Sequence, residues 1–320
     1  MHHGSIRRIG IIGGGSMGWT IALDFALAGC SVTLFNTRAE SSARARDNVG
    51  RGLALMRTTG LVSDEAAAAA PARIAYTTEL AEAVAAQDFL VESIPEDLSL
   101  KQQLFRELDR LARPDTILTS NTTALSITAI ASVCTRPERV LSVHYYLPAH
   151  LIPLVDVLPA ESTDPAVIET ACQFLEEIGK WPARFKRDAP GSVGPRLQAA
   201  MMSEAFKIVQ EGVATPEMVD RIITMGIGRR FAITGIFDRL DLAGLDVAAV
   251  MSRSRGQPVP PVIAQHVERG ELGVKTRQGF YSWDAAAAAA LEERMARHLI
   301  ELLKQDRARG LVRTPEGDAS

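Results

Sequence analysis

Three glycines near the start of the chain constrain its fold more than any other feature. The run "RRIGII" (residues 7–12) is typical of a buried strand, and "SMGWTIALDFALAG" (16–29) is typical of a helix. The spacing Gly-x-Gly-x-x-Gly between them would permit a tight turn, let a pyrophosphate approach the backbone, and let the helix pack closely on the strand. The pattern predicts a dinucleotide with its pyrophosphate at the helix N-terminus, and an ordinary strand–helix turn is the alternative. The residues expected there are Gly13, Gly15, Ser16, Met17 and Gly18.

The same alternation of strand and helix continues through the first half of the chain. Further strand-like runs lie at 31–36, 88–94, 116–121, 139–146 and 152–158. Apolar runs that are separated by helices indicate a parallel sheet covered on both faces. The fold class expected is α/β, a Rossmann-type doubly wound sheet followed by an all-helical C-terminal domain.

Glycine, proline and charge gather in "KRDAPGSVGPR" (186–196), which is typical of a domain boundary. We therefore expect a dinucleotide-binding domain over 1–187 and a helical substrate and dimerisation domain over 188–320. Beyond the boundary only "GFYSW" (279–283) resembles a strand. The tract of alanines at 285–290 predicts a C-terminal helix that ends near Gly310, followed by ten residues that we expect to fray.

Composition excludes several classes of protein. The 320 residues carry a formal net charge of −3, which does not favour binding to nucleic acid or to a membrane surface. No apolar run approaches the roughly 20 residues that span a bilayer, and the start of the chain lacks the pattern of a signal peptide. The three cysteines lack CxxC spacing, which favours a reduced, cytoplasmic protein. No metal site is expected, and His2 and His3 are not interpreted as ligands.

The end of the second strand bears on the choice of dinucleotide. NAD enzymes usually place Asp or Glu there to bind both ribose hydroxyls, whereas this chain has Asn36, Thr37 and Arg38. A neutral amide does not repel a 2′-phosphate, and an arginine can pair with it. The sequence therefore favours NADP over NAD. The alternative is that Asn36 binds the ribose of NAD and Arg38 is solvated.

An ionisable pair accompanies two strand-like runs. His144 falls at the carboxyl end of one run and Asp156 lies in the next, so the two could meet at the mouth of the sheet. A histidine titrates near neutral pH and can take the proton of a hydroxyl group, and a carboxylate can orient it. Asn121 and Thr123, just past another strand, would add polar groups on the same edge. A buried structural His–Asp pair is the alternative.

Ordered motifs along the chain resemble those of the L-3-hydroxyacyl-CoA dehydrogenase superfamily. "VESIPEDLSLKQQLFRELD" is similar to its "VEAVxENxxxKxxLFxxLD", and "SNTTALSIT" is similar to its "SNTSSLxIT". "RVLSVHYYLPAHLIPLVDVL" resembles "RxxGxHFFNPxxxxxLVEVI", "DAPGSVGPRL" resembles "DxPGFxxNRL", and "GVKTRQGFYSW" resembles "GxKTGxGFYxY". The resemblance runs from Ile9 to about Trp283 and implies an NAD(P)-dependent dehydrogenase that acts on a CH–OH group.

The resemblance also implies roles for residues. His144 takes the place of the catalytic histidine, and Asp156 takes the place of the glutamate that orients it, one methylene shorter. Thr123 falls where a serine contacts substrate and nicotinamide. Glu96 and Lys101 fall where the family lines the nicotinamide ribose, although helix capping and a solvated charge would also explain them.

Departures from the family motifs bear on the substrate. Leu147 and Pro195 replace two asparagines, so two polar substrate contacts are absent. The segment "GIGRRFAITGIFDRLDLAGLD" (226–246) resembles the branch that acts on free hydroxy acids and small alcohols, such as L-gulonate, L-carnitine and pyridine-carboxylate dehydrogenases. Arg230 occupies the position of an arginine in that branch and could bind a substrate carboxylate, unless it is simply a surface charge.

The leading hypothesis is hydride transfer between a nicotinamide and a small hydroxy or oxo acid or alcohol. One alternative is a true 3-hydroxyacyl-CoA dehydrogenase, for which the arginines of residues 39–57 would supply charge for CoA phosphates. The other is a catalytically inert dinucleotide-binding protein. The family commonly forms homodimers, which the helix beginning at Arg196 would suit.

Overall fold

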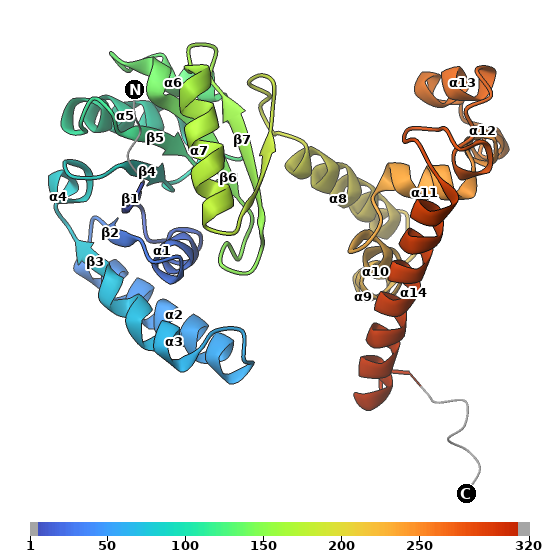
Figure 1. The fold of residues 1–320 in the computed structure, drawn as a ribbon, viewed down its shortest axis with the longest axis horizontal. Helices are drawn as coiled ribbons and strands as arrows, with labels where there is room; N and C mark the ends of the chain where they lie inside the picture. Colours follow the sequence, from blue (N-terminus) through green and yellow to red (C-terminus); the bar gives the residue numbers. More distant parts are fainter. Residues whose placement is uncertain (1–5, 313–320) are drawn as a thin grey trace, which may run out of the picture. The chain divides into compact units, whose positions relative to one another are not determined.

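The structure is a computed structural model that describes residues 6–312 (Figure 1). Contacts divide the chain into two compact units, one ending at Met201 and the other beginning at Met202. The predictions for His2, His3 and most of the last ten residues fall outside the described residues.

The first unit is built on one eight-stranded sheet with the order β3-β2-β1-β4-β5-β6-β7-β8. All neighbouring strands run parallel except β6 and β7, which pair antiparallel, so the expectation of a wholly parallel sheet was wrong at that pair. The strands are β1 (Arg8–Ile12), β2 (Ser31–Phe35), β3 (Ile74–Thr77), β4 (Phe89–Glu92), β5 (Ile117–Ser120), β6 (Val140–Tyr145), β7 (Leu154–Pro159) and β8 (Trp181–Arg184).

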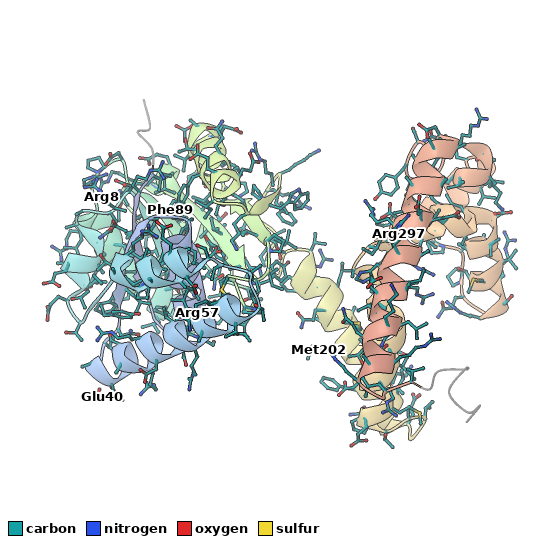
Figure 2. The ribbon with its side chains drawn as sticks, turned by 60° about the horizontal axis from the view of Figure 1, so that its bottom comes forward. Arg8, Glu40, Arg57, Phe89, Met202 and Arg297 are labelled. Atoms are coloured by element: carbon teal, nitrogen blue, oxygen red, sulfur yellow. The ribbon has the colours of Figure 1, made fainter. Side chains whose placement is uncertain are left out.

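Helices cover both faces of this sheet, as the apolar strands predict. One hydrophobic cluster joins the sheet to α1, α2 and α7, and a second joins it to α4, α5 and α6. Phe89 is wholly buried, whereas Glu40 and Arg57 extend from α2 into solvent (Figure 2). The helices are α1 (Gly18–Leu27), α2 (Ala39–Thr58), α3 (Asp64–Ala69), η1 (Ala70–Arg73), α4 (Leu80–Val84), α5 (Leu98–Leu111), α6 (Ile127–Ala131), η2 (Pro137–Arg139) and α7 (Pro165–Glu177).

The antiparallel pair of β6 and β7 determines where the ionisable pair lies. Leu141, Val143 and Tyr145 point into the first hydrophobic cluster, so the alternating His144 points to the opposite face. His144 pairs in register with Asp156. Asp156 therefore reaches His144 from the third position of an antiparallel strand, and not from the carboxyl end of a parallel one.

The second unit is helical. Its small core is built from Leu245, Ala249 and Ile263, and the strand expected at 279–283 is replaced by isolated bridges such as Gln278↔Ser282. Helix α8 (Gly194–Gln210) spans the division between the units, and α14 (Ala285–Ala308) begins with the alanine tract and ends near Gly310, as predicted. The remaining helices are α9 (Pro216–Ile222), η3 (Ile223–Ile227), α10 (Gly228–Phe231), α11 (Ile236–Ala243), α12 (Leu245–Ser254), α13 (Pro261–Glu268), η4 (Val274–Thr276) and α14 (Ala285–Ala308).

The buried carboxylate of Asp241 organises the loop that precedes α14. It accepts the backbone N–H groups of Phe280 and Tyr281 and the indole N–H of Trp283, at 2.9 to 3.0 Å. Within residues 6–312, no helix combines the length and the apolar character needed to cross a membrane.

Candidate active site

The glycine loop joins β1 to α1 in the conformation that its spacing predicts. Gly13 has φ +105°, and its N–H donates to the carbonyl of Phe35 at 3.0 Å. A Cβ on Gly18 would lie 1.8 Å from the carbonyl oxygen of Gly13, whereas one on Gly15 would meet nothing within 4 Å. The loop therefore packs tightly against α1 at Gly18 and is open at Gly15, where a pyrophosphate could approach. Ser16 is exposed beside it, and Met17 precedes the first residue of α1.

A cavity of about 460 Å³ adjoins this loop. It lies over the carboxyl ends of β1, β2 and β4, where ligands bind in open α/β sheets. The lining residues include Gly13, Gly15, Asn36, Thr37, Ser93, Ile94 and Leu104. A mostly apolar cavity beside an open glycine loop fits one nucleoside half of a dinucleotide.

Asn36 is buried and its amide is already engaged. The amide oxygen accepts the N–H of Gly14 at 2.9 Å, and the amide nitrogen donates to the Ser42 hydroxyl at 3.1 Å. The side chain thus fixes the glycine loop and places no negative charge beside the cavity. Thr37 and Arg38 are exposed next to it.

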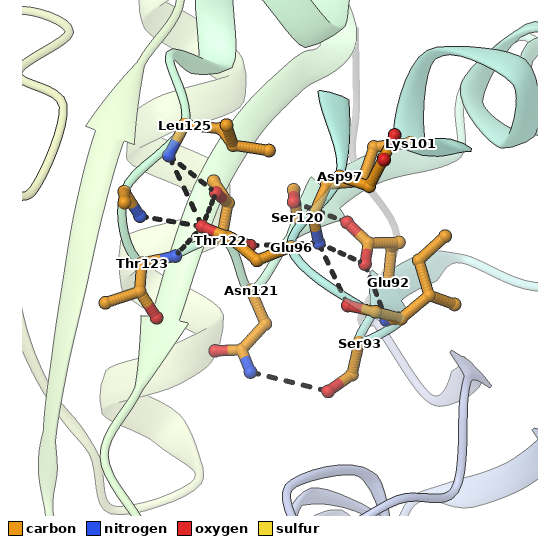
Figure 3. A network of polar contacts seen from close by, with 12 residues as sticks. Glu92, Ser93, Glu96, Asp97, Lys101, Ser120, Asn121, Thr122, Thr123 and Leu125 are labelled. Atoms are coloured by element: carbon orange, nitrogen blue, oxygen red, sulfur yellow. Dashed lines mark hydrogen bonds and ion pairs between the residues drawn. The ribbon is translucent and has the colours of Figure 1, made fainter. Parts of the chain in front are cut away.

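Glu96 binds the loop that follows β5 (Figure 3). One carboxylate oxygen accepts the Thr122 hydroxyl at 2.7 Å and the N–H groups of Thr123 and Ala124 at 2.9 and 2.7 Å. Burial alone would raise the pKa of Glu96, but these donors hold it below its ordinary value. Glu96 therefore fixes the backbone that carries Thr123.

Lys101 is buried, contrary to its possible interpretation as a solvated helix charge. Its amine lies 2.6 Å from the fully buried Glu92 carboxylate and 3.5 Å from Glu96. Glu92 also accepts the Ser120 hydroxyl at 2.5 Å (Figure 3). Sequence reasoning missed Glu92, although an acidic residue that closes an apolar strand was a usable signal.

His144 lies between two groups at the edge of the sheet. Its Nε2 is 3.4 Å from the Thr123 hydroxyl, and its Nδ1 is 3.6 Å from Asp156 Oδ2. Asn121 supports this edge, because its amide oxygen accepts the Tyr145 N–H at 2.8 Å. The structure thus brings together His144, Asp156, Thr123 and Asn121, which the sequence predicted to share an edge.

Two further residues contact Asp156. The hydroxyls of Tyr146 and Ser192 each donate to its Oδ2 at 2.8 Å. Burial alone would raise the pKa of Asp156, but the His144 ring and the two hydroxyls hold it below its ordinary value. The sequence motifs could have pointed to these two residues, because both positions are phenylalanine in the family patterns "HFFNP" and "DxPGF", whereas this chain has a hydroxyl at each.

The remaining predicted residues differ in their surroundings. Leu147 is 57% exposed, and Pro195 is the second residue of α8. In the second unit, Arg229 is bound to Asp306 at 2.5 Å. Arg230 is partly buried and makes no ion pair with the described residues. Burial and the nearby guanidinium of Arg230 both lower the pKa of Arg239.

A Rossmann-type sheet, a glycine loop and a His–Asp pair together define a dinucleotide-dependent dehydrogenase. The model of the 3-hydroxyacyl-CoA dehydrogenase NAD-binding domain matches residues 8–189, and the model of its C-terminal domain matches residues 191–283. The chain belongs to the 3-hydroxyacyl-CoA dehydrogenase family. It carries that family's NAD-binding domain, and the curated relatives described next are all named as dehydrogenases.

Several relatives with different substrates are similar to the chain. A 5-formyl-3-hydroxy-2-methylpyridine 4-carboxylate 5-dehydrogenase of Mesorhizobium japonicum is 30% identical over 92% of this chain and 96% of its own. A 3-hydroxybutyryl-CoA dehydrogenase of Bradyrhizobium diazoefficiens is 31% identical over 88% and 97%. An L-carnitine dehydrogenase of Bacillus cereus is 32% identical over 76% and 74%.

A solved structure agrees with the fold. The crystal structure of a 5-formyl-3-hydroxy-2-methylpyridine 4-carboxylic acid 5-dehydrogenase, described as an NAD⁺ dependent dismutase, superposes with a TM-score of 0.73. It is 30% identical and covers 93% of this chain and 98% of that one.

Proposed function

We propose that the chain transfers a hydride between a nicotinamide dinucleotide and the carbinol or carbonyl carbon of a small hydroxy or oxo acid. One observation carries this proposal. The His144 Nε2 lies beside the Thr123 hydroxyl, on a dinucleotide-binding sheet, with a carboxylate behind the ring. We propose residues 1–187 as the cofactor domain and 188–320 as the helical substrate domain.

The residues of the chain suit the proton transfer in this reaction. In the oxidative direction the substrate hydroxyl donates its proton to His144 Nε2, while the carbinol hydrogen leaves as hydride and the C=O bond forms. Thr123 donates a hydrogen bond to the same substrate oxygen. The bound nicotinamide supplies the hydride acceptor. Asp156 stabilises the imidazolium that forms.

The substrate we favour is a free acid and not an acyl-CoA. Leu147 and Pro195 cannot hydrogen-bond a keto oxygen, and Arg230 has a guanidinium without an ion-pair partner among the described residues. The arginines of α2 that could bind CoA phosphates have other contacts. Arg44 and Arg51 donate within the helix, and Arg46 lies 4.7 Å from the centre of the Tyr76 ring.

Removing the imidazole tests the proton-transfer role. Purified protein is titrated with NADH and NADPH by fluorescence and then assayed against a panel of hydroxy acids and oxo acids. The variant His144→Ala should retain cofactor binding and lose turnover by at least about a hundredfold, because general acid–base catalysis contributes that much. Retained turnover in this variant would remove His144 from the mechanism.

Arg230 tests the class of substrate. Arg230→Ala should raise KM for an acidic substrate at least about tenfold and leave KM for a neutral alcohol nearly unchanged, since a charge-assisted pair is lost. Arg239→Ala serves as the matched control for loss of a neighbouring guanidinium. Binding of the protein to immobilised CoA, with turnover of an acyl-CoA and not of free acids, would instead support the 3-hydroxyacyl-CoA reaction.

Three finer features are also proposed. The neutral Asn36 and the exposed Arg38 support a preference for NADP over NAD. The three unpaired cysteines support a cytoplasmic location. The exposed apolar side chains of Met202, Phe206 and Val213 in the helical unit support a homodimer.

A further inference from the structure

The carboxylate of Asp156 accepts hydrogen bonds from two hydroxyl groups but none from the imidazole of His144. Tyr146 and Ser192 both donate to Oδ2 at 2.8 Å. Each carboxylate oxygen has about two lone-pair sites, so these hydroxyls occupy both sites on this atom. Nδ1 of His144 is buried, lies 3.6 Å from Oδ2, and has no hydrogen-bond partner among residues 6–312. A separation of that length is an ion-pair distance and not a hydrogen bond.

Two features indicate that this arrangement is built into the fold. Tyr146 follows β6, packs edge-on against the His144 ring with centroids 4.9 Å apart, and is therefore held beside both members of the pair. Ser192 is buried and has φ +30°, a left-handed conformation that is unfavourable for a residue with a Cβ. The strained backbone aims its hydroxyl at Asp156. Burial and the Asp156 carboxylate raise the pKa of Tyr146 far above its ordinary value, so it stays a donor.

We propose that Tyr146 and Ser192 are positioning residues that occupy Asp156 Oδ2, withhold it from His144 Nδ1 and thereby lower the basicity of the catalytic imidazole. The inference rests on the proposed role of His144 as acid and base. A direct hydrogen bond from Nδ1 to a carboxylate favours the protonated ring. Without that bond the protonated ring is less stabilised, so the ring releases its proton more readily.

Other charged groups around the pair have partners of their own. From the surrounding elements these are Glu96 with the loop after β5, Glu92 with Lys101, Asp188 with Ser126, and Arg184 with Glu169 and Glu176. Lys186 and Arg187 after β8 are exposed. None of these contacts involves the hydroxyl of Tyr146 or of Ser192.

The test measures the pH at which the imidazole of residue 144 takes up its proton, by NMR of histidine-labelled protein, with His144→Ala for assignment. In Tyr146→Phe combined with Ser192→Ala, the midpoint should rise by about one pH unit, and each single variant should give a smaller rise. The acid limb of the kcat/KM profile should move with it. Ser192→Gly removes the same hydroxyl and relieves the backbone, so it should shift the midpoint as Ser192→Ala does.

Controls separate this effect from loss of structure. Tyr145→Phe removes a buried hydroxyl that has no hydrogen-bond partner in the described part of the chain, and Ser142→Ala removes another hydroxyl from the same strand. Neither should move the midpoint. In an Asp156→Asn background the double variant should cause no shift, because no carboxylate is released. An unchanged or lowered midpoint in the double variant overturns the inference.

The two proposals fail differently. The titration is made without substrate, so it reports on the hydroxyls whether or not turnover is found. If the midpoint rises in the double variant but His144→Ala keeps full activity, the catalytic role of His144 is refuted. The hydroxyls of Tyr146 and Ser192 would then tune an imidazole that takes no part in catalysis. An inactive His144→Ala with an unshifted midpoint would overturn only the present inference.

Discussion

Position 36 is where a single side chain serves both the fold and the choice of ligand. The amide of Asn36 binds the glycine loop through Gly14 and binds α2 through Ser42. An aspartate could keep the first bond and accept the second from the hydroxyl, so the fold does not require the amide. The ligand distinguishes the two, because only the carboxylate would repel a phosphate on the adenosine ribose.

Asn36→Asp should therefore shift cofactor preference toward NAD. We expect the ratio of the NADPH and NADH dissociation constants, measured by fluorescence titration, to change by at least about tenfold, since each 1.4 kcal/mol is a factor of ten. Asn48→Asp on α2 adds the same charge away from the cavity and should leave the ratio unchanged. An unaltered ratio in Asn36→Asp would refute the argument for NADP.

At the scale of elements, the apolar strands and amphipathic helices could be predicted, and the two less apolar strands at the edges of the sheet could not. β3 and β8 are four residues each at the two edges of the sheet, and "IAYT" and "WPAR" carry no continuous apolar run. The direction of β7 was also missed, because an apolar run does not reveal whether its neighbour is parallel. His144 and Asp156 were nevertheless expected to meet, since both directions bring them to one edge.

The contacts made by side chains were harder to predict than the elements. Gly13, Gly15 and Gly18 could be read from local spacing alone. The donors to Asp156 come from positions 146 and 192, which are separated by β7, α7 and β8. Contacts between such distant positions depend on tertiary structure. The sequence offered only one indication of them, which is that this chain has hydroxyl side chains where the family patterns have phenylalanine.

Helix α5 is attached to the sheet through Lys101, which permits a prediction of stability. Lys101→Met leaves the fully buried Glu92 without its cation, and breaking a buried pair typically costs about 3–5 kcal/mol. Unfolding in denaturant should show that the free energy of unfolding of the first unit falls by about this amount. Lys186→Met, at an exposed lysine of the same unit, should change the free energy of unfolding by less than about 0.5 kcal/mol.

Adding Glu92→Gln to Lys101→Met removes the uncompensated charge and should restore part of the loss. A loss below about 1 kcal/mol in Lys101→Met would mean that the pair does not hold α5.

At the scale of the whole molecule, the second unit carries several large apolar side chains that are exposed, and a cluster of such side chains is typical of a surface that another protein covers. No residue of α8 or α9 is buried. Met202, labelled in Figure 2, is 47% exposed, and Phe206 and Val213 are 61% and 71% exposed. A second copy of the chain would cover such a face, because identical helices present the same surface to each other about a two-fold axis.

We predict that the protein is a homodimer in solution, with a mass twice the 34.5 kDa of one chain. Phe206→Glu should weaken dimerisation at least about tenfold in sedimentation equilibrium, since a charge would replace a large apolar side chain in the covered face. Leu55→Glu alters a side chain of α2 that is 62% exposed and should leave the association unchanged. If the wild-type protein has the mass of one chain at every protein concentration, the prediction of a homodimer is wrong.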